Sequence, residues 1–405
     1  MNKDELIYDW NVVGRKEAAA RRVELNDESL RDGLQSPSVI DPPIEQKINL
    51  LHLMDSLGIH SADIGLPGAG PRAVADVTRL AEEIVACKLD IQPNCAARTV
   101  LADIIPIVEI SQKVGIPIEA CTFIGSSPIR QYAEGWSLEM MLTATEEAVK
   151  FATSHGLPVM YVTEDTTRAH PDTVRALYRT AIEAGARRIC VCDTVGHATP
   201  EGVRALIAYV KEIVREVGPD FEIKIDWHGH QDRGLGVINT LAAFEAGADR
   251  LHGTALGIGE RVGNTPMDQL LVNLKLMGYI DNDLTNLTRY CEAASAATGV
   301  PIPVSYPVVG RDAFRTATGV HAAAVIKAFR KGDDWLADAV YSGVPARAFG
   351  REQEIEIGPM SGKSNVIFWL ERHGIEPTAE RVERLFGRAK LSASVLTTDE
   401  IMQSI

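Results

Sequence analysis

The stretch EIKIDWHGHQDRGLGVINTLAAFEAGADRLHGTAL, residues 222–256, carries the pattern that decides the fold. It begins and ends with short apolar runs, and a longer segment with helical periodicity separates them. A strand, a helix and a second strand in this order form the βαβ unit of a parallel sheet. We therefore expect two parallel strands and their connecting helix here.

The same pattern recurs between residues 20 and 260. A representative connection is residues 171–185, which open with Pro171 and Asp172 and close at Gly185, as a helix between two strands does. A last helix is expected in MDQLLVNLKLMG, residues 267–278. The eight apolar runs begin near Val23, Ser61, Lys88, Pro117, Pro158, Arg188, Glu222 and Asp249.

Strands and helices that alternate in this way predict an α/β fold, the (β/α)8 or TIM barrel. An open doubly wound sheet is the alternative, but no G-x-G-x-x-G motif follows the first strand. After Gly278 the repeat ends and the pattern becomes mainly helical. We expect an N-terminal arm over 1–20, the barrel over 21–280, and C-terminal helical subdomains over 281–405.

Composition limits the partners that the chain can have. Its 405 residues carry a formal net charge of -14, which argues against general affinity for nucleic acid or an anionic membrane. No apolar run approaches the ~20 residues of a membrane helix, and the polar N-terminus does not resemble a secretion signal. The six cysteines lack paired zinc spacing, so most are expected to be small buried side chains. We expect a cytoplasmic protein that acts on small molecules.

Polar residues gather where the predicted strands end, which is where barrel loops converge on one open face. His228 and His230 are two residues apart at such an end, so their imidazoles point to the same side. An H-x-H pair also occurs for packing alone, but carboxylates after the first strand favour a metal site. Imidazole and oxygen ligands together permit Mg²⁺, Mn²⁺ or Zn²⁺ without selecting one.

Three motifs resemble those of the DRE-TIM metallolyases. Residues 30–35, LRDGLQ, resemble the L-R-D-G-x-Q signature of that family, and residues 228–248 resemble its H-x-H-N-D-x-G-x-A-x-A-N motif. Residues 257–264, GIGERVGN, match its G-x-G-E-R-x-G-N loop. The resemblance covers the whole barrel and implies four metal ligands and a catalytic arginine. These are Asp32, His228, His230 and Asn264 for the metal, and Arg31 for the arginine.

The same resemblance implies four further positions that bind substrate or act beside it. Gln35 falls on a polar neighbour of the site, and Asp63 stands where the family usually has glutamate. Glu164 and Thr194 match positions that line the oxo-acid pocket. A solvated loop acid and a turn threonine are the alternative interpretations of these last two residues.

The segment beyond the barrel resembles the Claisen-condensation branch, which contains the 2-isopropylmalate, homocitrate and citramalate synthases. Residues 310–321, GRDAFRTATGVH, together with Tyr341 and SGKSNV from Ser361, resemble the extension of these synthases. The resemblance implies that His321 and Tyr341 act in catalysis or support it, and we hypothesise that His321, with Tyr341 and Glu164, handles a proton. The resemblance also implies a homodimer with shared active sites. Thr316 and Ala317 replace a His-Glu pair, which indicates an unusual acceptor or an altered proton transfer.

The expected activity is a divalent-metal-dependent condensation of acetyl-CoA with a 2-oxo acid, followed by thioester hydrolysis. In outline the chain resembles a 2-isopropylmalate synthase without the leucine regulatory domain. Met160 stands where homocitrate synthases carry an arginine, which favours an acceptor with an apolar distal group. Citramalate, homocitrate or other alkylmalate synthesis remains open, as does a lyase of the 3-hydroxy-3-methylglutaryl-CoA type. A non-catalytic metal-binding barrel is a further alternative that the retained site residues disfavour.

Overall fold

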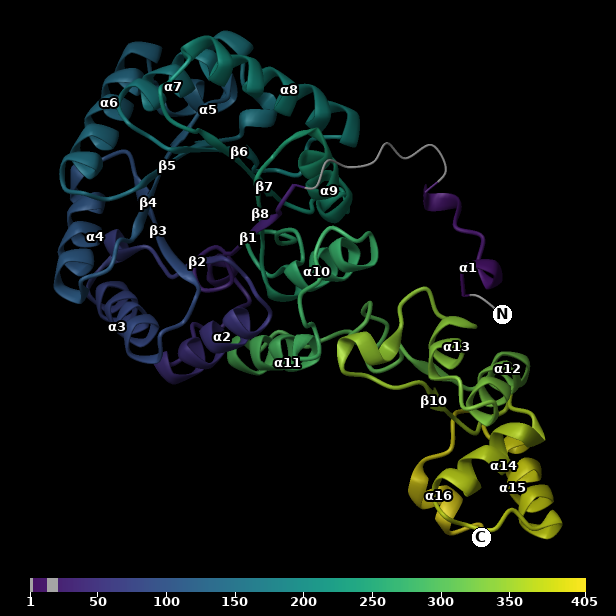
Figure 1. Cartoon of the computed structure of the whole chain (residues 1–405). Helices are drawn as coiled ribbons and strands as arrows, with labels where there is room; N and C mark the ends of the chain where they lie inside the picture. Colours follow the sequence, from purple (N-terminus) through teal and green to yellow (C-terminus); the bar gives the residue numbers. More distant parts are fainter. Residues whose placement is uncertain (1–2, 13–20) are drawn as a thin grey trace.

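A computed structural model describes residues 3–12 and 21–405, so half of the N-terminal arm expected over 1–20 lies outside the described residues. In the described part, eight parallel strands close into a barrel inside a ring of helices (Figure 1). Neighbouring strands follow the chain order, and β8 closes on β1 with Glu24 opposite Arg250. The barrel expected from the sequence is confirmed. Its strands are β1 Glu24–Asp27, β2 Ser61–Asp63, β3 Gln92–Arg98, β4 Glu119–Gly125, β5 Val159–Glu164, β6 Arg188–Asp193, β7 Lys224–Gly229 and β8 Arg250–Gly253.

The helices around the barrel begin and end where their terminal residues permit. In α7 the backbone N–H of Asp172 donates to the His170 side chain before the first turn, and Gly185 follows the last turn with φ +111°. Their apolar faces pack on the outer side of the strands and form the main core. The surrounding helices are α2 Ile44–Ser56, α3 Pro71–Cys87, α4 Leu101–Val114, α5 Pro128–Glu134, α6 Leu138–Ser154, α7 Pro171–Glu183, α8 Pro200–Val217, α9 Gly236–Ala246 and α10 Met267–Leu276.

Much of the inside of the barrel is polar. Arg250 of β8 donates from Nη2 to Glu119 of β4 at 2.6 Å, and because these strands are not neighbours the contact crosses the interior. Asn26 Oδ1 accepts from Ser61 Oγ at 2.7 Å and from Asn94 Nδ2 at 2.6 Å. Barrels usually fill this space with branched apolar residues. Here hydrogen bonds and ion pairs occupy it and lead up to the C-terminal rim.

The C-terminal region is mainly helical, as expected, and most of it lies to one side of the barrel (Figure 1). Its first helix, α11, packs against α2, and the buried Tyr290 donates to Asp27 of β1. The main core continues as far as Phe349, and a second core lies around Trp369 and Leu385. The helices are α11 Leu287–Thr298, α12 Gly319–Arg330, α13 Asp334–Ala339, α14 Lys363–Arg372, α15 Ala379–Leu391 and α16 Thr398–Met402, with a parallel pair of strands, β9 Arg315–Thr316 and β10 Glu354–Ile355.

The remaining short elements connect these parts. Among the described residues, no helix combines the length and the apolar character that crossing a bilayer requires. The short elements are α1 Lys3–Leu6, η1 Trp10–Val12, η2 Gly33–Gln35, η3 Pro67–Ala69, η4 Thr166–Arg168, η5 Ala255–Gly257 and η6 Ala346–Phe349.

Candidate active site

Four side chains expected to bind metal meet at the C-terminal rim of the barrel. Nε2 of His228 lies 3.2 Å from Nε2 of His230, both at the end of β7. Oδ2 of Asp32, just after β1, lies 3.4 Å from Nε2 of His228 and 3.9 Å from Nε2 of His230. Asn264 is placed beside them because its backbone forms an antiparallel bridge with His230. Residues from three loops are thus brought to one point.

The atoms of this cluster fit a divalent ion. Oδ1 of Asp32 and Oδ1 of Asn264 are buried without a hydrogen-bond partner, a condition that is costly unless a ligand satisfies them. One ligand atom from each of Asp32, His228 and His230 lies within 4.8 Å of the others. Carboxylate, amide and imidazole donors suit Mg²⁺, Mn²⁺ or Zn²⁺.

The electrostatics of the cluster also suit a cation. Burial and the neighbouring His228 lower the pKa of His230 to about 4, so this imidazole is neutral near pH 7 and keeps a lone pair for a metal. Burial alone would raise the pKa of Asp32, but Arg31 together with the neighbouring histidines outweighs burial and lowers the pKa. The pocket therefore presents an ionised carboxylate beside a neutral imidazole.

The loop after β8 approaches the cluster so closely that one position requires glycine. Gly259 has φ +151°, and a Cβ atom there would lie 2.2 Å from Nδ2 of Asn264. The same Cβ would lie 3.5 Å from Oδ1 of Asp32. A side chain at Gly259 would displace one candidate ligand and crowd another.

Arg31 is fixed beside the cluster by three carboxylates. Nε donates to Oδ2 of Asp63 at 2.9 Å, Nη1 donates to Oδ2 of Asp32 at 3.3 Å, and Nη2 donates to Glu28. Burial raises the pKa of Asp63 to about 7 in spite of Arg31. Asp63 thus holds Arg31 in place. The aspartate at this position, where a glutamate was the usual residue, therefore has a defined contact.

A cavity of about 290 Å³ opens next to the cluster. Arg31, Gln35, Asp63, Glu164 and Thr194 all line it, so every residue expected to contact substrate in the barrel lies at one cavity. Burial raises the pKa of Glu164, which favours its protonated form. Oγ1 of Thr194 accepts a hydrogen bond from the Asp165 backbone N–H at 2.8 Å, so its orientation is fixed.

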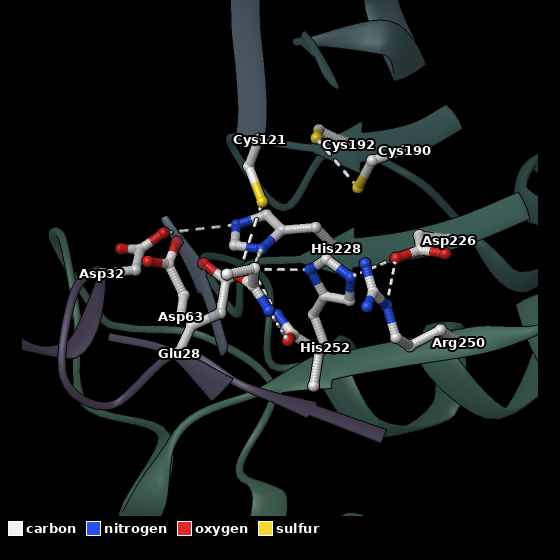
Figure 2. A network of polar contacts seen from close by, with 12 residues as sticks. Glu28, Asp32, Asp63, Cys121, Cys190, Cys192, Asp226, His228, Arg250 and His252 are labelled. Carbon is white, nitrogen blue, oxygen red and sulfur yellow. Dashed lines mark hydrogen bonds and ion pairs between the residues drawn. The ribbon is translucent and has the colours of Figure 1, made fainter. Parts of the chain in front are cut away.

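The inner wall of this cavity is rich in sulfur and apolar. Met160, Cys121, Cys190 and Cys192 pack together there with Val162. The cysteines lie above His228 in Figure 2, and Sγ of Cys190 is 3.8 Å from Sγ of Cys192. Burial raises the pKa of the Cys121 and Cys190 thiols well above the usual value, so they are neutral lining groups. The expectation that most cysteines are buried is confirmed, because Cys87 is the exposed exception.

His321 and Tyr341 lie elsewhere. His321 is on α12 and Tyr341 follows α13; both are exposed, and their rings stack with centroids 4.2 Å apart. Neither lines the cavity of its own chain. The structure pairs these residues with each other but does not bring them to the metal cluster, and their catalytic role stays a prediction.

A second set of buried polar residues was not singled out from the sequence. His252 lies between Glu28 and Asp226, and Asp226 pairs with Arg250 (Figure 2). Period-two alternation is the pattern that could have found them. Asp226 precedes His228 by two residues, as Arg250 precedes His252, so each pair shares a strand face.

Comparisons with known proteins agree with this geometry. The HMGL-like family model matches residues 22–296. A homocitrate synthase AksA of Methanopyrus kandleri is 33% identical over an alignment of 398 residues, and the match covers 96% of this chain and 94% of that protein. A 2-isopropylmalate synthase of Lactococcus lactis is 31% identical and covers 91% of this chain and 70% of its own length.

Solved structures give the same fold. The hydroxymethylglutaryl-CoA lyase of Pseudomonas aeruginosa matches with a TM-score of 0.57 and 20% identity, over 72% of this chain and 96% of that one. The HMG-CoA lyase of Brucella melitensis matches with a TM-score of 0.56 and 18% identity, over 68% and 98% of the two chains. At such identities the likeness shows the barrel and nothing more specific.

Proposed function

Because the chain belongs to the HMGL-like family, we propose that it is a metal-dependent synthase that condenses acetyl-CoA with a 2-oxo acid. The observation that carries this proposal is the extent of the similarity. A protein named as a synthase matches 96% of the chain, including the helices beyond the barrel, whereas the lyase structures match 68 to 72%. A synthase therefore accounts for the C-terminal region and a lyase does not.

The residues at the rim have separate roles in the proposed reaction. A divalent ion held by Asp32, His228, His230 and Asn264 would supply a Lewis acid that polarises the ketone of the oxo acid. Arg31, which Asp63 orients at 2.9 Å, faces the same region and stabilises the negative charge that develops on the ketone oxygen. These groups bind and activate the acceptor.

The other partner needs a base, because the methyl group of acetyl-CoA must lose a proton before it attacks the ketone. We assign this step to His321, supported by Tyr341, with Glu164 as a contributing carboxyl group in the cavity wall. His321 and Tyr341 would come from the second subunit of a homodimer, since they do not line the cavity of their own chain. Hydrolysis of the thioester then releases free CoA thiol.

The cavity favours an acceptor with an apolar distal group. Its inner wall contains Met160, Val162 and the neutral cysteines, and none of the described residues that line it is an unpaired arginine or lysine. Arg261, the second arginine among the described lining residues, is already paired with Asp232 at 2.7 Å. We rank 2-oxoisovalerate and pyruvate above 2-oxoglutarate, although one methylene changes selectivity by only about 1–3 kcal/mol.

The decisive experiment measures thiol release from acetyl-CoA by metal-loaded protein with 2-oxoisovalerate, pyruvate, 2-oxobutyrate or 2-oxoglutarate. Release that depends on a monocarboxylic acceptor supports the proposal, and Asp32→Asn is the matched inactive control. A preference for 2-oxoglutarate would overturn the apolar assignment alone. If metal is bound but no acceptor supports thiol release, the proposed synthase activity is overturned. Release of acetyl-CoA from 3-hydroxy-3-methylglutaryl-CoA would then establish a lyase.

The shared site has its own test. His321→Ala protein should bind metal normally and release no thiol. Mixing it with Asp32→Asn protein under conditions that exchange subunits should restore about a quarter of the wild-type activity, because half of the dimers then carry one intact site. Full activity of His321→Ala alone would remove His321 from the mechanism, and no recovery on mixing would argue against sharing.

A further inference from the structure

Glu28 contacts three groups of the site at once. It is 3% exposed and follows β1 directly. Its Oε1 lies 3.2 Å from Nδ1 of His228 and 2.6 Å from Nδ1 of His252, and its Oε2 accepts from Nη2 of Arg31. One carboxylate thus joins a candidate metal ligand to the arginine that faces the substrate.

The contact with His228 decides which ring nitrogen is free. When Nδ1 donates its proton to Glu28, the lone pair of the neutral ring lies on Nε2, which is the atom that faces Asp32 and His230. A carboxylate in this position also fixes the ring orientation and raises the basicity of the ligand nitrogen. Glu28 therefore prepares His228 to bind a cation.

Glu28 is in turn held in place by a chain of buried side chains that begins at His252. His252 bonds Glu28 through Nδ1 and Asp226 through Nε2, at 2.6 and 2.8 Å (Figure 2). Asp226 is fixed by Nε of Arg250 at 2.6 Å and by Nη1 of Arg188 at 2.7 Å. The carboxylate of Glu28 cannot turn away from His228 without breaking this buried chain of contacts.

We propose that Glu28 is a positioning residue that holds both His228 and Arg31 for catalysis, and that His252 and Asp226 keep it in place. This inference rests on the proposed metal-dependent function and deepens it. In this role Glu28 raises the affinity of the site for the ion and fixes the orientation of the Arg31 guanidinium. A catalytic contact with substrate is not part of this role.

A second ion held by Glu28, His228 and His252 is the competing interpretation, since one ligand atom of each lies within 4.8 Å of the others. The hydrogen bonds argue against it. Both nitrogens of His252 already face carboxylates, and no buried oxygen of Glu28 lacks a partner in the described structure. Asp32 and Asn264, by contrast, each keep an unpartnered buried oxygen.

The test compares Mn²⁺ or Co²⁺ binding to wild type and Glu28→Gln in the absence of substrates. We expect one ion per chain and a loss of affinity of about 10- to 100-fold in Glu28→Gln. The matched control is Glu119→Gln, which removes a charge from the same network, bonded to Arg250 at 2.6 Å, but leaves every contact of His228 intact. Its affinity should equal that of wild type even if its stability falls.

Two further measurements separate positioning from simple loss of structure. The visible spectrum of bound Co²⁺ should shift in Glu28→Gln, and the KM for the oxo acid should rise, because Arg31 loses one of its partners. If Glu28→Gln does not fold, His252→Gln replaces it and should show a smaller loss of affinity in the same direction.

Each outcome bears on a different statement. Equal metal affinity in folded Glu28→Gln and wild type would overturn the role of Glu28 while leaving the synthase intact. Binding of two ions per chain would mean that Glu28 ligates a second ion directly and does not act by positioning His228. A wild-type protein that takes up no ion would overturn the metal site of the proposed function, and the role of Glu28 with it.

Discussion

The two ends of the barrel interior differ in whether their buried polar groups have partners. At the base, Arg188 pairs with Glu24 and Asp226, and Arg250 pairs with Asp226 and Glu119, at 2.6 to 2.7 Å. None of these groups has a buried side-chain atom without a partner in the described structure. At the rim, Asp32, His230 and Asn264 each have one.

This difference distinguishes buried polar groups that stabilise the fold from those that are available to a ligand. Buried charges that satisfy one another need nothing further, although removing one of them leaves its partner exposed to a large desolvation cost. Several buried polar atoms that remain unsatisfied together at the edge of one cavity favour a ligand there. We therefore expect the base to stabilise the barrel, and the rim to be where the proposed ion binds.

The largest effect is expected at the rim. Asp32→Asn keeps the shape of the side chain but removes the charge that a cation needs, so metal binding should be lost. Loss of the Lewis acid costs several kcal/mol of transition-state stabilisation, or about 10³-fold in thiol release. Metal analysis and the thiol assay check this, and urea unfolding should remain close to wild type. An active, metal-loaded Asp32→Asn protein would contradict the assignment.

At the base the effect should appear in stability. Arg250→Leu removes one of the two arginines that compensate Asp226 and Glu119, and leaves Arg188 at 2.7 and 3.6 Å from these carboxylates. Because the buried charges are then only partly compensated, we expect the free energy of unfolding to fall by about 3–5 kcal/mol. Urea denaturation measures this difference. A loss below about 1 kcal/mol, the range of exposed pairs, would show that the base network is not structural.

The pH dependence of stability should have opposite signs at the two ends. Burial raises the pKa of Asp63 to about 7, so the folded state keeps a proton there that the unfolded chain loses near pH 4. Stability from this group is therefore present at low pH and lost as pH rises towards 7. For Asp226 burial acts in the same direction, but Arg188 and Arg250 outweigh it and lower the pKa. Its contribution is present above about pH 4 and lost on acidification.

Asp63→Asn isolates this difference. Between pH 4.5 and 7.5 the variant should lack a decline in the free energy of unfolding that wild type shows, on the order of 1–3 kcal/mol. Urea titrations in the presence of a chelator measure it without the pH dependence of metal binding. Parallel curves for both proteins would contradict the raised pKa of Asp63.

The smallest effect is expected outside the barrel. Arg204 and Glu245 form a pair at 3.0 Å between α8 and α9, with 46% and 37% of the side chains exposed. Arg204→Leu should change the free energy of unfolding by less than about 1 kcal/mol, because solvent screens the pair. It serves as the control for Arg250→Leu in the same denaturation series. An equal loss in both variants would erase the distinction between buried and exposed pairs.

Much of the fold and part of the site could be predicted from local patterns. Alternating strands and helices identified the barrel, because short-range periodicity reflects which face of each element is buried. The spacing of His228 and His230 predicted that they share a face, and the structure places their Nε2 atoms 3.2 Å apart. The motifs around Asp32 and Asn264 supplied the other candidate ligands, which lie on the same rim.

The sequence by itself determined the order of strands and helices, the shared face of the two histidines and the position of the polar loops. Tertiary structure alone decided what stands opposite each side chain. Arg250 meets Glu119, 131 residues away, and His252 meets Glu28, 224 residues away. Periodicity fixes the direction of a side chain relative to its own strand, but only closure of the barrel selects the atoms it faces. For this reason the sequence alone could not distinguish Glu28 from the acidic residues beside it.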